Sequence, residues 1–167
     1  MSMSIGILTT SRKPSRKTRS LAKALSRFMN WRYVTRGKLS LEELYSMLGK
    51  NEYLAIIEEV KGNPAILKII HPKKGVVLWI RFNVSNIVKV KMDDSPVVFI
   101  GKAPFDPVIF GALPQTEAGL KLARKIDPKK KVFVKSDDEW IILDFRYENQ
   151  TVFKMKIRKE GGIKYGG

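Results

Sequence analysis

The chain has 167 residues, a length that fits one domain or two small halves that share a core. Its 32 Lys and Arg outnumber its 16 Asp and Glu, and a net charge of +16 attracts polyanions such as nucleic acid. The chain has no cysteine, which excludes disulfides and cysteine-ligated metal, and its single histidine, His71, gives little from which to build a catalytic triad.

A membrane partner is not expected, because no apolar run reaches the roughly 18 residues that a span requires. Met1–Gly6 has no basic residue before its short apolar stretch and therefore does not resemble a secretory signal. We expect a cytoplasmic protein.

Apolar runs and turn residues, taken in chain order, predict an α/β chain with mixed sheets. Ser15 and Ser40 are the expected N-caps of two helices, and Glu43 completes a capping box with Ser40. The segment from Gly161 is expected to be a mobile tail. The predicted helices cover 15–30, 41–48 and 114–126, and the predicted strands cover 5–10, 32–35, 53–60, 65–71, 76–84, 87–91, 97–100, 132–135, 140–147 and 151–158.

Two hairpin-like stretches, 53–70 and 140–157, align at an offset of 87 residues, with a turn at the same place in each. One interpretation is a duplicated α/β half, with the break at Asp93-Asp94-Ser95-Pro96 near the midpoint. The other is that any two antiparallel hairpins look alike at this level. The residues alone leave both open.

The segment from Arg12 to Lys38 is strongly basic, with ten Lys and Arg in 27 residues and no acid among them. At 100° per residue, Arg16, Arg19, Lys23 and Arg27 fall within roughly 80° of one another on the predicted helix. Leu21, Leu25, Phe28 and Met29 fall on the opposite face. A solvated face usually mixes charge signs, so this one-sided ridge indicates polyanion binding.

The start of that helix is a further candidate anion site, since its free N–H groups and dipole favour a phosphate beside Arg12 and Lys13. Hydroxyl donors from Thr9, Thr10 and Ser11 are expected to assist. The glycines and lysine of a P-loop are absent, so nucleotide hydrolysis is not inferred.

Aromatic residues lie among these cations. Trp31 and Tyr33 could stack on unpaired bases, which favours RNA over DNA, although core packing is the alternative and the better interpretation for Phe28.

Catalysis has weaker candidates. The acidic clusters at 58–59, 93–94 and 137–139 could hold Mg²⁺ in a nuclease, but they lie at predicted strand ends and turns, where acids commonly act as solvated breakers. His71 closes an apolar strand and is interpreted as structural or RNA-facing. No catalytic residue, metal site or cofactor is assigned.

The sequence resembles a known family. Thr9–Ser20, followed by Arg36–Leu44, is similar to the opening of the Brix domain, and the Gly62-Asn63-Pro64 turn with His71 is similar to the family's Gly-Asn-Pro segment. The second half departs from the pattern, because the Gly-Pro-Arg signature of eukaryotic members is absent and 148–153 is its nearest counterpart.

The resemblance implies a short archaeal Brix-like domain at 1–160, made of halves 1–92 and 93–160, with a tail at 161–167. Each half would resemble the anticodon-binding domain of class II aminoacyl-tRNA synthetases. The function implied is a non-catalytic, monomeric ribosome biogenesis factor that binds ribosomal RNA or its precursor and works with other assembly proteins.

A metal-dependent nuclease of rRNA processing and a tRNA-binding module are the alternatives. The residues predicted to bind RNA are Thr10, Ser11, Arg12, Lys13, Arg16, Lys17, Arg19, Lys23, Arg27, Arg32, Arg36 and Lys38.

Overall fold

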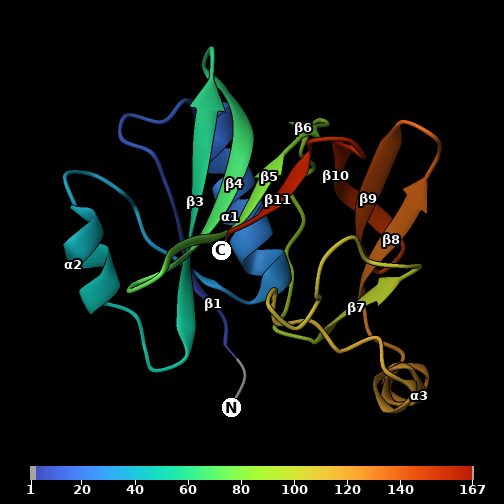
Figure 1. Ribbon diagram of the computed structural model, residues 1–167. Helices are drawn as coiled ribbons and strands as arrows, with labels where there is room; N and C mark the ends of the chain where they lie inside the picture. Colours follow the sequence, from blue (N-terminus) through green and yellow to red (C-terminus); the bar gives the residue numbers. More distant parts are fainter. Residues whose placement is uncertain (1–2, 167) are drawn as a thin grey trace.

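The computed structural model describes residues 3–166, which form two mixed sheets that share one core, with α1 in contact with both (Figure 1). This confirms the predicted mixed α/β class. The helices are α1 (Arg16–Met29), α2 (Leu41–Ser46) and α3 (Glu117–Ile126). The strands are β1 (Ser4–Thr10), β2 (Arg32–Tyr33), β3 (Glu52–Val60), β4 (Asn63–His71), β5 (Gly75–Arg81), β6 (Asn83–Val84), β7 (Val97–Ile100), β8 (Lys130–Ser136), β9 (Trp140–Tyr147), β10 (Gln150–Arg158) and β11 (Ile163–Tyr165).

The helix starts follow the predicted caps. The side chain of Ser15 accepts a hydrogen bond from the backbone N–H of Thr18, and Ser40 and Glu43 form the expected reciprocal box. The third helix is shorter than predicted, because its N-cap is Thr116 and the preceding residues form a loop.

Both sheets repeat one topology. The first has the order β11-β5-β4-β3-β1-β2 and the second β6-β10-β9-β8-β7. In each, a parallel pair (β1 with β3, β7 with β8) is followed by two antiparallel pairs. The first sheet adds a second parallel pair at its edge, β1 with β2. β3-β4-β5 therefore corresponds to β8-β9-β10. The 87-residue offset, which aligned β3-β4 with β9-β10, was wrong by one strand, because consecutive hairpins look alike until the parallel neighbour is known.

The two sheets exchange edge strands. β6 follows β5 in the chain but pairs with β10, and β11 follows β10 but pairs with β5. The expected strand 76–84 is thus divided at Phe82 between two sheets. The segment from Gly161, predicted to be a mobile tail, instead adds β11 to the first sheet, and Gly162 accepts a hydrogen bond from Arg81. Pairing with an open sheet edge orders a segment whose composition suggests mobility.

α1 fills the space between the sheets. It packs on one face of the first sheet, and its Phe28 ring meets Phe145 of β9 edge to face, with centroids 5.3 Å apart. The other face of the first sheet is covered by α2, where Leu44 packs against Ile7 and Leu54. In this way α1 holds one side in the shared core and leaves its opposite side at the surface.

Candidate nucleic-acid interface

α1 presents its cations on one side, as predicted. Its apolar side is fully buried at Leu21, Leu25 and Phe28, whereas the side chains opposite are exposed. Asn30 adopts a left-handed conformation with φ 63° and ends the helix. The exposed row, here called the α1 ridge, consists of Arg16, Arg19, Lys23 and Arg27.

A second row of cations faces the α1 ridge. The segment 87–92, of which 87–91 was predicted as a strand, has no regular secondary structure. The backbone N–H of Val88 donates to the carbonyl oxygen of Val152 and holds the segment beside the second sheet. Val90 and Met92 pack against the core, and Lys89 and Lys91 stay exposed. Between this segment and α1 runs a groove of about 750 Å³, here called the α1 groove, lined by both rows.

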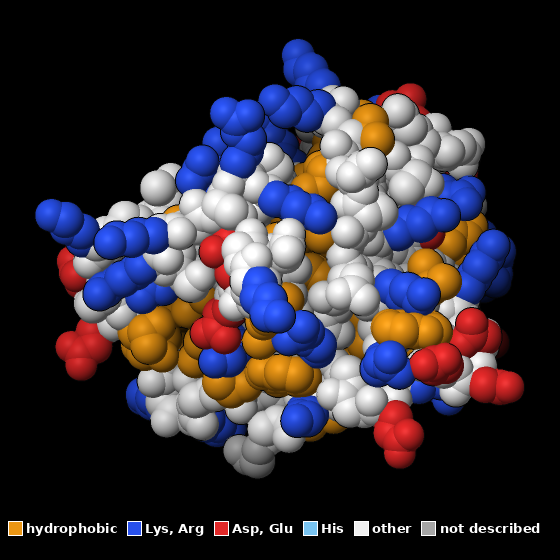
Figure 2. Space-filling view, turned by 90° about the horizontal axis from the view of Figure 1, so that it is seen from above, with side chains coloured by type: hydrophobic (Ala, Val, Ile, Leu, Met, Phe, Trp, Pro, Cys, Tyr) orange, Lys and Arg blue, Asp and Glu red, His pale blue; other side chains and the backbone are white. Residues whose placement is uncertain are grey.

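These charges are uncompensated. Within the part of the chain that the structure describes, none of the four ridge residues, nor Lys89 or Lys91, has a carboxylate within 4.0 Å. Lys and Arg also predominate over Asp and Glu on the face seen in Figure 2. Six unpaired cations on two walls of one groove repel one another, and phosphate groups would relieve that repulsion.

The loops before and after α1 form a second basic hollow of about 680 Å³. It brings together Arg12, Lys13 and Lys38, which are exposed, with Arg19 and the half-buried Arg36. Arg36 donates to the carbonyl oxygens of Leu39 at 2.8 Å and Thr10 at 3.1 Å, so it ties the two loops together. Burial, and then the neighbouring Arg12, lower the pKa of Arg36.

A carboxylate of the protein itself lies at the start of α1, where a phosphate was expected. The carboxylate of Glu59, on β3, accepts hydrogen bonds from the backbone N–H of Ser15 at 2.8 Å and from the hydroxyl of Thr18. Burial raises the pKa of Glu59, but these hydrogen bonds outweigh it and hold the pKa below its ordinary value. No acid lies within the basic segment, so only the tertiary structure reveals this internal anion.

Two of the three expected hydroxyl donors, Thr9 and Thr10, are already engaged within the protein. Thr9 and Thr10 are fully buried, and their hydroxyls donate to the carbonyl oxygens of Val34 at 2.6 Å and Ser11 at 2.9 Å. Among the predicted cations, Arg32 reaches the carbonyl oxygen of Met47, and neither it nor the exposed Lys17 lines the hollows described above.

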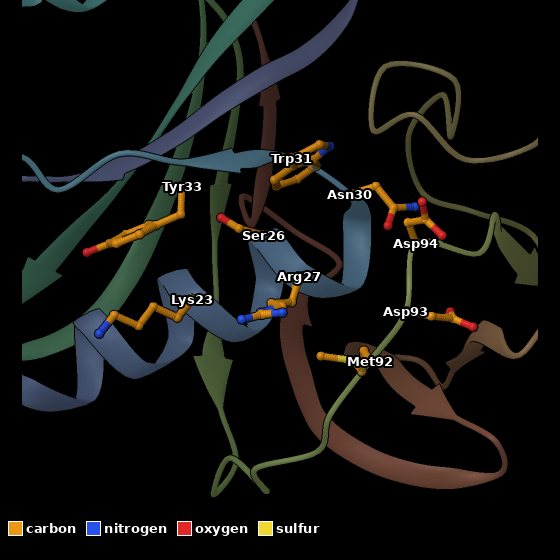
Figure 3. A pocket seen from close by; sticks show the side chains of 9 residues that line it. All are labelled: Lys23, Ser26, Arg27, Asn30, Trp31, Tyr33, Met92, Asp93 and Asp94. Carbon is orange, nitrogen blue, oxygen red and sulfur yellow. The ribbon is translucent and has the colours of Figure 1, made fainter.

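The aromatic residues divide between core and surface. Trp31 is 7 % exposed, its indole N–H donates to the carbonyl oxygen of Phe110 at 2.9 Å, and it is therefore a core residue rather than a stacking surface. Tyr33 is half-buried and lines both the basic hollow and a third one, of about 700 Å³, near the C-terminal end of α1 (Figure 3). Ser26 also lines this third hollow, and its buried hydroxyl has no hydrogen-bond partner among residues 3–166.

Comparison with known proteins places the chain in a family. It is 57% identical over 153 residues to a probable Brix domain-containing ribosomal biogenesis protein of Archaeoglobus fulgidus, covering 92% of this chain and 95% of that protein. The chain belongs to the Brix-domain family of ribosomal biogenesis proteins. A relative so named from Methanothermobacter thermautotrophicus is 43% identical over 79 residues, about half of each chain. No family model matches the sequence.

Solved structures have the same fold as this Brix-domain chain. The crystal structure of Mil, an archaeal Imp4-like protein, matches with a TM-score of 0.64 and 25% identity over 96% of this chain and 99% of that one. A probable ribosomal biogenesis protein from Aeropyrum pernix matches with a TM-score of 0.68 and 21% identity over 98% and 99%.

The acidic clusters of this Brix-domain protein serve turns and ion pairs. Asp93 accepts hydrogen bonds from Ser95 and from Lys129, which together hold its pKa far below the ordinary range. Glu58 pairs with Lys68 at 3.1 Å. Over residues 3–166, no three His, Asp or Glu side chains come together as metal ligands would.

The lone histidine belongs to a turn. Nδ1 of His71 accepts the backbone N–H groups of Lys73 at 3.0 Å and Lys74 at 3.3 Å. This bonding fits the structural interpretation of His71. In the part of the chain described, no helix is long and apolar enough to cross a membrane.

Two functional candidates were missed from the sequence. Lys89 and Lys91 alternate with apolar residues, and that pattern predicted an edge strand or a half-buried strand. The alternation leaves both lysines exposed while Val90 and Met92 pack against the core, but only the fold brings the lysines across the α1 groove from the ridge.

Proposed function

We propose that this protein binds ribosomal RNA or its precursor in the α1 groove and assists ribosomal subunit assembly without catalysing bond chemistry. The observation that carries the proposal is the pair of unpaired cation rows, Arg16, Arg19, Lys23 and Arg27 on one wall and Lys89 and Lys91 on the other. Family membership supports ribosomal RNA as the polyanion, since the relatives are named as ribosomal biogenesis proteins.

Screening is the physical basis of the assembly role. An RNA segment in the α1 groove would have several phosphates neutralised, which lowers its repulsion for other segments and releases condensed counterions. Tyr33 lies half-exposed beside the ridge and would stack on an unpaired base. Other assembly proteins are the expected partners.

The experiment measures RNA affinity against salt. For about six phosphates on a single strand, log K falls against log salt with a slope near −4. The triple variant Arg19→Gln, Lys23→Gln, Arg27→Gln should flatten that slope by about 2. The matched control is Lys121→Gln, Arg124→Gln, Lys125→Gln, which removes the same charge from exposed positions of α3.

Equal slopes for the two triples would contradict the proposal, because the effect would then belong to net charge and not to the α1 groove. The protein is tested with three RNAs: fragments of ribosomal RNA, tRNA of matched length, and labelled precursor RNA with Mg²⁺. Preference for tRNA would favour a tRNA-binding module, and cleavage lost in an Asp93→Asn, Asp94→Asn variant would favour a nuclease.

A further inference from the structure

The second sheet has an outer face that points away from α1. Its inner face carries Phe145, which meets Phe28 of α1, so the residues alternating with Phe145 point outward. Strand register places Lys135, Ile142 and Lys156 side by side across β8, β9 and β10. The outward residues are Lys131, Phe133, Lys135, Trp140, Ile142, Asp144, Arg146, Lys154, Lys156 and Arg158, here called the outer sheet face.

Aromatic rings and cations interleave on this face. The ammonium nitrogen of Lys156 lies 4.3 Å from the ring centroid of Trp140, and the guanidinium carbon of Arg158 lies 4.6 Å from it. The guanidinium carbon of Arg146 lies 4.7 Å from the centroid of Phe133. The cations lie over the ring faces, and aromatic rings and cations are the two kinds of group with which proteins hold unpaired bases and their phosphates.

The charge on this face is also unbalanced. Its acid, Asp144, is 6 % exposed and accepts hydrogen bonds from Arg146 at 2.8 Å and Thr151 at 2.9 Å. Arg158 pairs with Glu139 at 2.8 Å, and Lys131 with Asp127 at 3.4 Å. The three remaining cations, Lys135, Lys154 and Lys156, are exposed and form no ion pair with any described residue.

Among residues 3–166, no helix covers this face as α2 covers the first sheet. α3 buries only Gly119 and Ala123 among its described residues. In Figure 1 it lies beyond the end of the second sheet near β7, not across β8, β9 and β10. The exposed cations Lys135, Lys154 and Lys156 of the outer sheet face are thus open to a ligand.

We propose that the outer sheet face binds a second, single-stranded RNA segment. Lys156 and Arg158 would move off the Trp140 ring, and Arg146 off the Phe133 ring, so that unpaired bases stack on the two rings. Lys135, Lys154 and Lys156 would then take the phosphates. This inference rests on the proposed function, in which the α1 groove binds RNA, and it adds the outer sheet face as a second RNA site. Because the second sheet separates the outer sheet face from α1, one protein molecule would hold two RNA segments on different sides and tether them.

The test uses two oligouridylates of about twelve nucleotides, one with a donor fluorophore and one with an acceptor. Wild-type protein should bind two strands and bring the fluorophores into energy transfer. The outer-face triple, Lys135→Gln, Lys154→Gln, Lys156→Gln, should keep one strand in the α1 groove and lose the transfer. Trp140→Leu should weaken the second binding event about tenfold, as loss of one stacked base does.

The outcomes separate the two proposals. Unchanged stoichiometry and transfer in the outer-face triple, with the α3 triple as the charge-matched control, would overturn the second site and leave the α1 groove untouched. If the Arg19→Gln, Lys23→Gln, Arg27→Gln variant loses both oligouridylates, the second site is also overturned, because both oligouridylates would then bind in the α1 groove. A wild-type protein that binds neither oligouridylate nor ribosomal RNA would defeat the proposed function itself.

Discussion

The ammonium nitrogen of Lys130 lies 2.9 Å from the carbonyl oxygen of Arg27, so a lysine of the second sheet closes the C-terminal end of α1. The same ammonium group donates to Oδ1 of Asn30 at 2.7 Å, and the Lys130 side chain is fully buried. A cation there meets the negative end of the helix dipole. The α1 ridge is thereby fixed to both sheets.

The Lys130 contact should make stability depend on pH. Burial lowers its pKa to about 8, against the opposing effect of Asp93 and Asp94. Between that value and the ordinary value of 10.5, the unfolded chain holds more protons than the folded one, so this group makes stability rise with pH. Compared with Lys130→Met, the wild type should gain up to about 1.4 kcal/mol per pH unit in that window.

Urea unfolding of both proteins at pH 7, 8, 9 and 10 measures this difference. A constant difference across the range would mean that Lys130 titrates normally. Below pH 7 the two curves should run parallel, because Lys130 is then protonated in both the folded and the unfolded chain.

Glu59→Gln should have opposite effects on stability and on RNA affinity. The neutral amide weakens the bonds to Ser15 and Thr18, with an expected loss of about 1 kcal/mol in urea unfolding. Since the pKa of Glu59 is lowered in the folded state, its contribution is present above the ordinary value of 4.5 and is lost as the pH falls through the folded pKa.

RNA affinity of Glu59→Gln should rise a fewfold at low salt, because an anion has left the surroundings of Arg19, a residue of the α1 ridge. Glu58→Gln, on the same strand, is the matched control and removes an ion pair with Lys68 instead. Equal gains in the two variants would show a general charge effect.

Substitutions of Trp31 and Tyr33 should have different effects, on the stability of the fold at Trp31 and on RNA affinity at Tyr33. Trp31→Phe removes the donor to the buried Phe110 carbonyl oxygen and should destabilise the fold by about 1–3 kcal/mol while RNA affinity stays unchanged. Tyr33→Leu should weaken RNA binding about tenfold with a smaller loss of stability. Thermal unfolding and anisotropy titration measure the two effects, and reversed roles would contradict the placement of the rings.

Deletion of residues 161–167 tests the role of β11. The truncation exposes the edge of β5 and removes the hydrogen bonds from Arg81 to Gly162 and from the Tyr165 hydroxyl to Pro104. We expect a loss of about 2 kcal/mol and a Tm lower by about 5 °C. A Tm equal to that of the full chain would contradict a stabilising role for β11 and support a mobile tail. The variant Tyr165→Phe measures the contribution of the hydroxyl group alone.

Local features were determined by the sequence. Ser15 and Ser40 cap their helices, and β9 runs from Trp140 to Tyr147 as predicted, because caps and apolar alternation act over a few neighbouring residues. The two-sided character of α1 follows from its 3.6-residue period alone. The ridge of Arg16, Arg19, Lys23 and Arg27 was therefore predictable.

The tertiary structure decided which distant residues meet. It placed Glu59 at the start of α1, Lys130 at its end, and Lys89 and Lys91 across the α1 groove. It also paired β11 with β5, which the composition of the last residues did not suggest. Strand pairing and burial depend on contacts between residues far apart in the chain, and these carry no local signal. The sequence thus determined that one helix is a cation ridge, and the fold determined what faces it.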